Sequence, residues 1–146
     1  MNQELSYIHV KDFTTQSGFH ISTLQLSYQL FGLELGTAPV VLVNHALTAN
    51  SLVAGEYGWW NQVIGKNKTI DTNKFTIISF NIPGNGYDGL LIENYQNFVA
   101  KDIANLFLIA LRKLGILKLH SIIGGSLGGG IAWEMAVLNP VIATHI

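Results

Sequence analysis

The chain has 146 residues, the size of one ordinary domain, so we expect a single domain over residues 1–146. A formal net charge of −1 with only 12% charged residues excludes a basic surface that would attract nucleic acid or an acidic membrane face. The mean hydropathy of +0.33 is high, but the apolar runs are far shorter than the ~20 residues of a membrane-spanning helix and suit buried strands instead.

Missing residue types and patterns limit which disulfides, metal sites and cellular locations we expect. The sequence has no cysteine, which removes disulfides and thiolate metal ligands. Its five histidines have no paired spacing, so we predict no metal site. Residues 1–4 show no basic region followed by an apolar core, which predicts no secretory signal and a cytoplasmic location.

The first predicted element is a hairpin. Residues 6–10 and 21–28 alternate apolar and polar side chains, which is typical of half-buried strands. Gln16, Ser17 and Gly18 form the turn between them. We expect an antiparallel hairpin at the edge of a sheet.

Apolar runs then predict three strands covered on both faces, at residues 40–43, 75–80 and 119–123. Between the second and third, apolar residues recur every three or four positions, which predicts a helix over residues 94–114 with Gly115 as its C-cap. A second helix is expected at residues 131–138. Strands that alternate with helices imply an α/β fold with a parallel sheet and right-handed crossovers.

The last six residues, 141–146, resemble the opening of another buried strand, with no turn or cap after it. We therefore expect the domain to be incomplete at its C-terminus.

One motif carries chemistry: Gly124-x-Ser126-x-Gly128, directly after a predicted strand and before a predicted helix. A sharp strand-to-helix turn strains the backbone at the serine and brings the flanking chains close, which requires glycine on both sides. The serine hydroxyl then projects above the carboxyl end of the sheet, and the helix N-terminus offers backbone donors to an oxyanion. We predict that Ser126 is the nucleophile of an α/β-hydrolase fold.

The alternatives are a glycine-rich turn that only packs tightly and a turn that binds phosphate. A phosphate-binding loop has a lysine after its glycines, and a dinucleotide-binding loop has a Gly-x-Gly-x-x-Gly spacing with a later acidic residue. The run Gly128-Gly129-Gly130 has neither feature. The nucleophile interpretation is therefore favoured.

The loop of residues 44–48 follows the first buried strand, where this fold places its second oxyanion donor. We predict the backbone N–H groups of Leu47 and Leu127 as the two donors. His45 is interpreted as a loop histidine hydrogen-bonded to backbone rather than as a chemical group, because the catalytic order in this fold is serine, acid, histidine.

That order also excludes the histidines that precede the serine, which are His9, His20 and His120. His145 follows Ser126, but the only acidic residue between them is Glu134, on the predicted helix. We therefore expect the acid and the histidine of the triad to lie outside these 146 residues.

Other residues carry weaker signals. Four acidic residues are interpreted as solvated or capping groups, namely Asp71, Asp88, Glu93 and Asp102. Trp59 and Trp60 either line a pocket or pack in the core, and both interpretations stay open.

Several segments together resemble the homoserine O-acetyltransferase family of α/β-hydrolase-fold acyltransferases. They follow the family's order over most of residues 40–138, and they are Asn44-His45-Ala46-Leu47-Thr48, Val53-Ala54-Gly55, Gly58-Trp59-Trp60, Ile64-Gly65 with residues 68–72, Asn81, and Gly124-Gly125-Ser126-Leu127-Gly128-Gly129. The resemblance implies the N-terminal half of that fold, with Ser126 accepting the acyl group and Leu47 and Leu127 as oxyanion-hole amides.

The same resemblance implies acetyl-CoA or succinyl-CoA as co-substrate, no bound cofactor, and the hydroxyl of homoserine or a similar acceptor, within methionine biosynthesis. The implied partners are small-molecule substrates and neither nucleic acid nor membrane, and a homodimer stays open. The sequence departs from the family where Lys66-Asn67 replaces the usual Pro-Gly, and where the Gly-Ser-Thr-Gly-Pro segment after residues 81–84 is missing. The family's lid, its carboxylate-binding arginine, and its triad acid and histidine fall beyond Ile146.

Two other functions compete with this one. A serine esterase uses the same turn with water as acceptor, and the family-like loops at residues 45–48 and 59–60 disfavour it. The second alternative is a catalytically inactive chain that keeps only part of the fold. The end of the sequence at Ile146 favours this alternative for the 146-residue polypeptide by itself.

Overall fold

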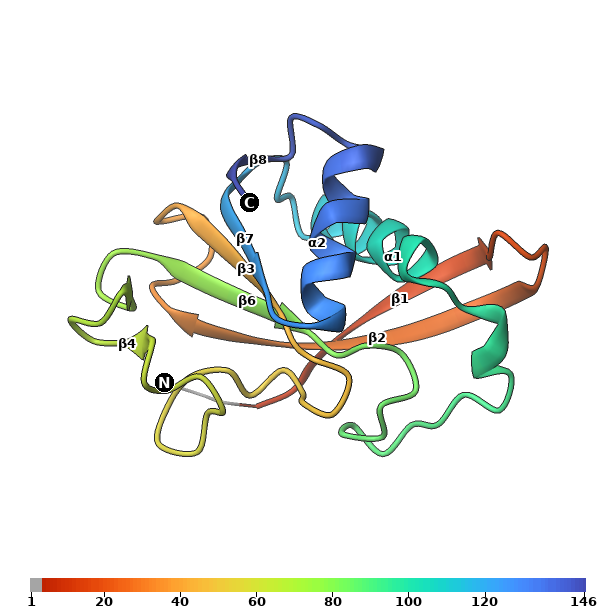
Figure 1. Ribbon diagram of the computed structural model, residues 1–146, viewed down its shortest axis with the longest axis horizontal. Coiled ribbons are helices and arrows are strands. Elements are labelled where there is room, and N and C mark those ends of the chain that lie inside the picture. Colours follow the sequence, from red (N-terminus) through yellow and green to blue (C-terminus); the bar gives the residue numbers. More distant parts are fainter. Residues whose placement is uncertain (1–3) are drawn as a thin grey trace.

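The apolar runs pair into one six-stranded sheet in the computed structural model, which describes residues 4–146 (Figure 1). The strand order is β1-β2-β6-β3-β7-β8. β2 is antiparallel to both of its neighbours, β1 and β6, and the other neighbouring strands are parallel. The strands are β1 (Ser6–Thr14), β2 (His20–Gly32), β3 (Val40–Asn44), β6 (Thr76–Phe80), β7 (Leu119–Gly124) and β8 (Ala143–His145).

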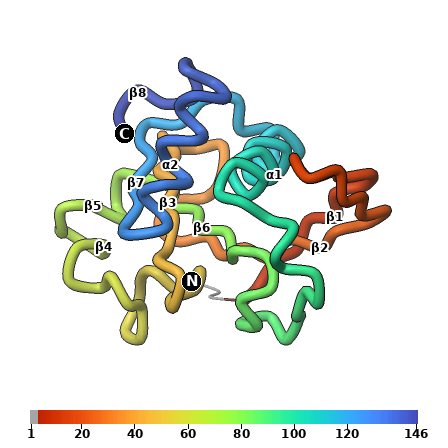
Figure 2. Tube along the Cα trace, turned by 45° about the vertical axis from the view of Figure 1, so that its right-hand side comes forward, coloured from red at the N-terminus to blue at the C-terminus, as the bar shows by residue number. Residues whose placement is uncertain are grey.

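Two α-helices, α1 (Ala100–Lys113) and α2 (Leu127–Leu138), pack against each other and against one face of this sheet (Figure 2). The larger hydrophobic core lies there, and in it the rings of Phe80 and Phe107 have centroids 5.0 Å apart. Residues 45–75 cover the other face and include a short parallel pair, β4 (Ile64–Gly65) and β5 (Ile70–Asp71). Every residue of the central strands β3 and β6 is buried, as their apolar sequences predicted.

The predicted hairpin and the order of strands and helices are confirmed, and β1 and β2 are longer than expected. The first long helix begins at Ala100 rather than at residue 94, because the Asp102 carboxylate accepts the Val99 N–H at 3.0 Å and so caps the helix. Residues 95–97 instead form the 3₁₀ helix η1 (Tyr95–Asn97). Gly115 follows the helix with a φ of +74°, as a C-terminal glycine should.

Two expectations at the C-terminal end are corrected. α2 begins at Leu127, directly after Ser126, and not at residue 131, because its first turn is made by glycines that lack apolar periodicity. The strand predicted within residues 141–146 exists as β8, but Ala143 is only half-buried and Thr144 and His145 are exposed, so it is not a buried strand. The reason is its place at the outer edge of the sheet, beside β7 alone.

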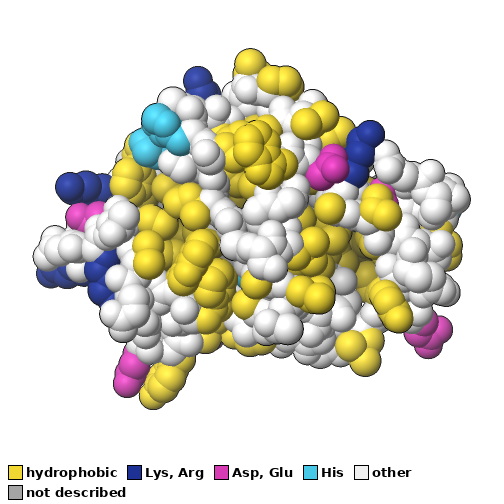
Figure 3. Space-filling model, viewed as in Figure 1, with side chains coloured by type: hydrophobic (Ala, Val, Ile, Leu, Met, Phe, Trp, Pro, Cys, Tyr) yellow, Lys and Arg dark blue, Asp and Glu magenta, His cyan; other side chains and the backbone are white. Residues whose placement is uncertain are grey.

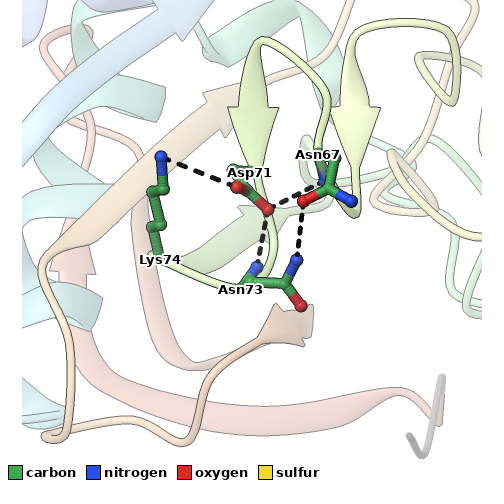
Figure 4. Close-up of polar contacts among 4 residues, drawn as sticks. All are labelled: Asn67, Asp71, Asn73 and Lys74. Carbon is green, nitrogen blue, oxygen red and sulfur yellow. Dashed lines mark hydrogen bonds and ion pairs between the residues drawn. The ribbon is translucent and has the colours of Figure 1, made fainter.

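Two of the acidic residues interpreted as solvated or capping groups cap the backbone, and both of them are buried. Asp102 is buried and also accepts the Gln16 N–H at 2.8 Å, which ties α1 to the hairpin turn. Asp71 is buried too, and its carboxylate accepts the backbone N–H groups of Asn67 and Asn73 and faces Lys74 (Figure 4). These two hydrogen bonds from the backbone lower the pKa of Asp71. Both carboxylates therefore stabilise backbone turns.

Within residues 4–146 no helix is both long enough and apolar enough to cross a membrane.

Candidate active site

Ser126 stands at the sharp turn between β7, which ends at Gly124, and α2, which begins at Leu127. Its backbone has φ +55° and ψ −123°, a region that residues with a side chain rarely occupy. Such strain costs roughly 1–3 kcal/mol and persists only where the surroundings enforce it. The serine side chain is exposed at the carboxyl end of the sheet, so the turn presents it to solvent.

The glycines on either side of the serine are there because backbone segments pass too close for any side chain. A Cβ on Gly124 would lie 2.2 Å from the Gly128 carbonyl oxygen. A Cβ on Gly128 would lie 2.1 Å from the carbonyl oxygen of Asn44, at the end of β3. Both distances are far below van der Waals contact, so the Gly-x-Ser-x-Gly pattern follows from this packing.

The backbone N–H groups of Leu47 and Leu127 come from separate elements, the loop after β3 and the first turn of α2. Both residues line one cavity of about 290 Å³, whose other walls are residues 82–85 and the segment from Tyr95 to Ile103. Among the described residues neither of these two N–H groups donates a hydrogen bond. The fold thus brings both residues to the wall of one cavity beside the N-terminus of α2, where the helix dipole favours negative charge.

His45 is buried and both of its ring nitrogens are occupied. Nε2 accepts the Ile82 N–H at 3.0 Å, so the ring proton lies on Nδ1, which donates to the Ala46 carbonyl at 2.6 Å. Burial lowers the pKa of His45, and the bond to the Ala46 carbonyl opposes this only in part. The histidine is therefore neutral and joins the loops after β3 and β6, which confirms its interpretation as a backbone-bonded residue.

A buried polar network supports the same two loops and was not predicted from the sequence. Asn81, at the end of β6, accepts the Ser51 N–H at 2.9 Å and donates to the hydroxyls of Ser27 and Ser51. Ser51 in turn donates to Gln29 at 2.6 Å. The signal was weak, because Ser27 lies at a polar position of the alternating run over residues 21–28, and Gln29 follows that run. The centre of β2 is buried on both faces instead.

No base contacts the serine within residues 4–146, since the Ser126 hydroxyl makes no hydrogen bond there. His145 pairs with Ser121 in the register of β7 and β8. Ser121 lies three residues before the end of β7, so His145 is ~10 Å from the carboxyl end of that strand. Its ring is tilted by 52° relative to that of His120, and the two ring centroids are 5.2 Å apart. Among the described residues, neither His145 nor another histidine therefore contacts the Ser126 hydroxyl.

The tryptophan pair packs on the second face of the sheet and reaches the turn. The Trp59 and Trp60 rings have centroids 4.6 Å apart, and the Trp59 indole N–H donates to the Asn50 carbonyl at 2.8 Å. A Cβ on Gly125 would lie 3.7 Å from the Trp60 ring. Trp60 therefore packs against the smaller core and also lies beside the turn that carries Ser126.

A larger cavity of about 470 Å³ lies between β2 and residues 81–94. It contacts neither Leu47 nor Leu127 and is separated from them by Ile82, Pro83 and Gly84, which line both cavities. Of these two cavities, only the smaller one is lined by both Leu47 and Leu127.

Comparison with known proteins agrees with this geometry. Residues 39–142 match the family described as alpha/beta hydrolase fold. The homoserine O-acetyltransferase of Methanohalophilus mahii is 34% identical to this chain, and the match covers 94% of this chain and 32% of that enzyme. The homoserine O-acetyltransferase of Corynebacterium diphtheriae is 32% identical, and the match covers 96% of this chain and 40% of that enzyme. These matches confirm the resemblance drawn from the sequence.

Solved structures give the same result. Esterase E22 superimposes with a TM-score of 0.83 at 26% identity, over 96% of this chain and 45% of its own. The Staphylococcus aureus homoserine O-acetyltransferase superimposes with a TM-score of 0.83 at 29% identity, over 97% of this chain and 45% of its own. The chain spans less than half the length of each of these relatives. The match to the M. mahii enzyme runs over 157 positions, more than this whole chain, so that enzyme carries extra residues inside the matched region.

Proposed function

The chain belongs to the α/β-hydrolase fold family, and on that premise we propose that it is the N-terminal part of a serine acyltransferase of the homoserine O-acetyltransferase kind. The observation that carries the proposal is the strained backbone of Ser126, with φ +55°, at the start of α2. Strain of this kind marks functional positions. The names of the related acetyltransferases support acyl transfer as the reaction.

In the proposed reaction the Ser126 hydroxyl attacks the thioester carbonyl of acetyl-CoA and gives its proton to a base. The tetrahedral intermediate collapses, the C–S bond breaks, and CoA leaves as the thiol after taking up that proton. The homoserine hydroxyl then attacks the acetyl-serine ester, its proton passes to the base, and the serine is regenerated with O-acetylhomoserine as product. The base is the triad histidine, which we expect outside these 146 residues.

The Leu47 and Leu127 N–H groups stabilise the oxyanion of each tetrahedral intermediate. Backbone donors fixed at such a position contribute roughly 3–4 kcal/mol each. His45 and Asn81 act indirectly, because they hold the loops that form the walls of the same cavity. Water must be kept from the acyl-serine, or hydrolysis replaces transfer.

The test of the nucleophile uses the complete gene product. Incubation with acetyl-CoA followed by intact-mass analysis should give one acetyl adduct, and Ser126→Ala should remove it. An adduct that persists in Ser126→Ala overturns the assignment. The 146-residue chain alone should show no turnover, because without a base the serine is a weak nucleophile.

A second candidate is an esterase, which the match to esterase E22 favours at a TM-score of 0.83. The two reactions share the acyl-serine and differ only in the acceptor, water or an amino-acid hydroxyl. An assay of thiol release from acetyl-CoA, with and without homoserine, separates them. Faster release with homoserine and formation of O-acetylhomoserine support transfer, whereas equal rates without that product favour the esterase.

A further inference from the structure

The larger cavity, of about 470 Å³, has no part in the proposed reaction. It lies where β2 extends beyond β6. β6 pairs with β2 only from Tyr28 to Gly32, so the part of this edge before Tyr28 has no strand beside it among the described residues. Residues 82–94 line the cavity on that side instead. The volume lies within the roughly 300–1,000 Å³ of small-molecule pockets in proteins.

The polar end of this cavity is a buried hydrogen-bond network that ends in a carboxylate. Ser27 is 1% exposed, and its hydroxyl donates to Oδ2 of Asp88 at 2.6 Å. Asn81 is 2% exposed, and its side-chain amide donates to the Ser27 hydroxyl at 2.9 Å. Oδ1 of Asp88 accepts the Leu90 N–H at 3.0 Å. These bonds hold the Asp88 carboxylate in one orientation at the cavity wall.

The charge of this carboxylate has no counterpart nearby. Asp88 has no cationic partner in the part of the chain that the structure describes, and no described lysine, arginine or histidine lines the cavity. Glu93 adds a second carboxylate to its wall. On the face seen in Figure 3, lysine and arginine side chains lie to the left and in the upper part, and none lies at the lower right, where Figure 1 places residues 82–94. The cavity therefore carries negative charge that residues 4–146 do not neutralise.

The other walls of the cavity are mostly apolar. β2 contributes Ile21, Leu24 and Leu26, and the segment after β6 contributes Leu90 and Ile92. Small-molecule sites combine apolar walls with a few placed polar groups in this way. A carboxylate offers more acceptor positions than the two that Asp88 uses, and its strongest hydrogen bonds are those from a charged donor. The walls thus suit a ligand with an apolar body and a cationic end.

We propose that this cavity binds a small organic cation, a primary ammonium group on a short apolar chain. The ammonium group donates hydrogen bonds to the Asp88 carboxylate, and the chain lies against the apolar side chains of β2 and of residues 90–92. Residues 82–84 form a wall that this cavity shares with the smaller one. The occupant therefore touches that wall without entering the cavity lined by Leu47 and Leu127.

The test uses hexylammonium chloride as the probe, with the purified chain, and follows binding by calorimetry and by the amide NMR signals. Hexanol and hexanoate carry the same chain with a neutral and a negative end. We expect hexylammonium to bind at least about tenfold more tightly than hexanol, and hexanoate not to bind. Ethylammonium should bind more weakly than hexylammonium, because it covers less of the apolar walls. Signal shifts should be confined to residues 19–27 and 81–94.

Asp88→Asn keeps the shape of the side chain and an acceptor for the Ser27 hydroxyl but removes the charge, so it should weaken hexylammonium binding at least about tenfold. Asp12→Asn is the matched control, because Asp12 is exposed on β1 and lines neither cavity. It should leave the affinity unchanged, and circular dichroism checks that each variant is folded.

A folded chain that does not bind hexylammonium overturns the proposal. So do equal affinities for hexylammonium and hexanol or for hexylammonium and ethylammonium, an equal loss in Asp88→Asn and Asp12→Asn, or shifts spread outside the cavity. The readout is binding to the chain itself, so its outcome stands apart from acyl transfer by Ser126.

Discussion

The two α-helices lie side by side on one face of the sheet, yet they are built by different rules. α1 has an acidic residue in its first turn, Asp102, and two basic residues in its last, Arg112 and Lys113, an arrangement that complements the helix dipole. α2 has no charge in either terminal turn, three glycines near its N-terminus and an apolar outer side. α1 is thus organised for its own stability, whereas α2 gives up helix stability at the end that presents Ser126.

The glycines of α2 make this difference concrete. Each glycine within a helix costs about 1 kcal/mol relative to alanine. Gly128 has no alternative, because Asn44 lies against it, but a Cβ on Gly130 would meet nothing within 4 Å. The close contacts, and hence the need for glycine, are confined to the residues next to the serine.

The largest expected effect concerns Ser126 itself. Ser126→Gly should reduce acyl transfer in the complete protein by roughly 10⁴-fold or more, because the nucleophile is lost. The fold should not be destabilised, since glycine relieves ~1–3 kcal/mol of backbone strain at φ +55°. Acetyl-transfer kinetics and urea unfolding measure the two effects. Loss of activity together with a large loss of stability would show that the serine is structural.

A pair of glycine substitutions tests the same helix end. Gly128→Ala should destabilise the chain by at least about 3 kcal/mol, because its Cβ has no room beside the Asn44 carbonyl. Gly130→Ala, two residues later, should stabilise it by about 0.5–1 kcal/mol. Urea unfolding followed by circular dichroism gives both values. Equal effects of the two substitutions contradict the close packing at the turn.

Asp102→Ala tests the other helix. It removes the acceptor for the Val99 and Gln16 N–H groups and leaves both donors without their partner, which should cost about 2 kcal/mol. Lys101→Ala, a neighbour that accepts neither bond, is the control and should change stability by less than ~0.5 kcal/mol. A similar result for both variants would mean that α1 does not depend on its cap.

The sequence was sufficient for the hairpin, the central strands and the serine turn, because each rests on a local pattern of apolar residues and glycines. It was insufficient where the cause is distant in the chain. The carboxylate of Asp102, which caps α1, also accepts the N–H of Gln16 in the distant hairpin turn. Ser27 accepts a hydrogen bond from Asn81, 54 positions later in the chain. Leu47 and Leu127 line one cavity although they belong to separate elements of the fold. Contacts of this kind have no periodicity, so only the folded structure reveals them.

The smallest expected effect is a pH dependence of the free energy of unfolding, caused by protonation of His45. The main-chain carbonyl of His45 lies close to Gly128. Burial lowers the pKa of His45 below 6.5 in the folded chain. In the unfolded chain it keeps its ordinary pKa, so below pH 6.5 the unfolded state binds a proton that the folded state does not. Stability from this residue is therefore fully present above pH 6.5 and falls as the pH drops toward the folded pKa.

His45→Gln separates this contribution from that of other groups. The variant cannot take up the proton, so its free energy of unfolding should fall less than that of the unmodified chain between pH 7 and pH 5. Protonated His45 would have N–H groups on both ring nitrogens, one of them facing the Ile82 N–H that Nε2 now accepts. The amide signal of Ile82 should therefore shift in the same pH range as the loss of stability. Parallel unfolding curves for the two proteins, with no shift at Ile82, would show that the loops after β3 and β6 are held together without this hydrogen bond.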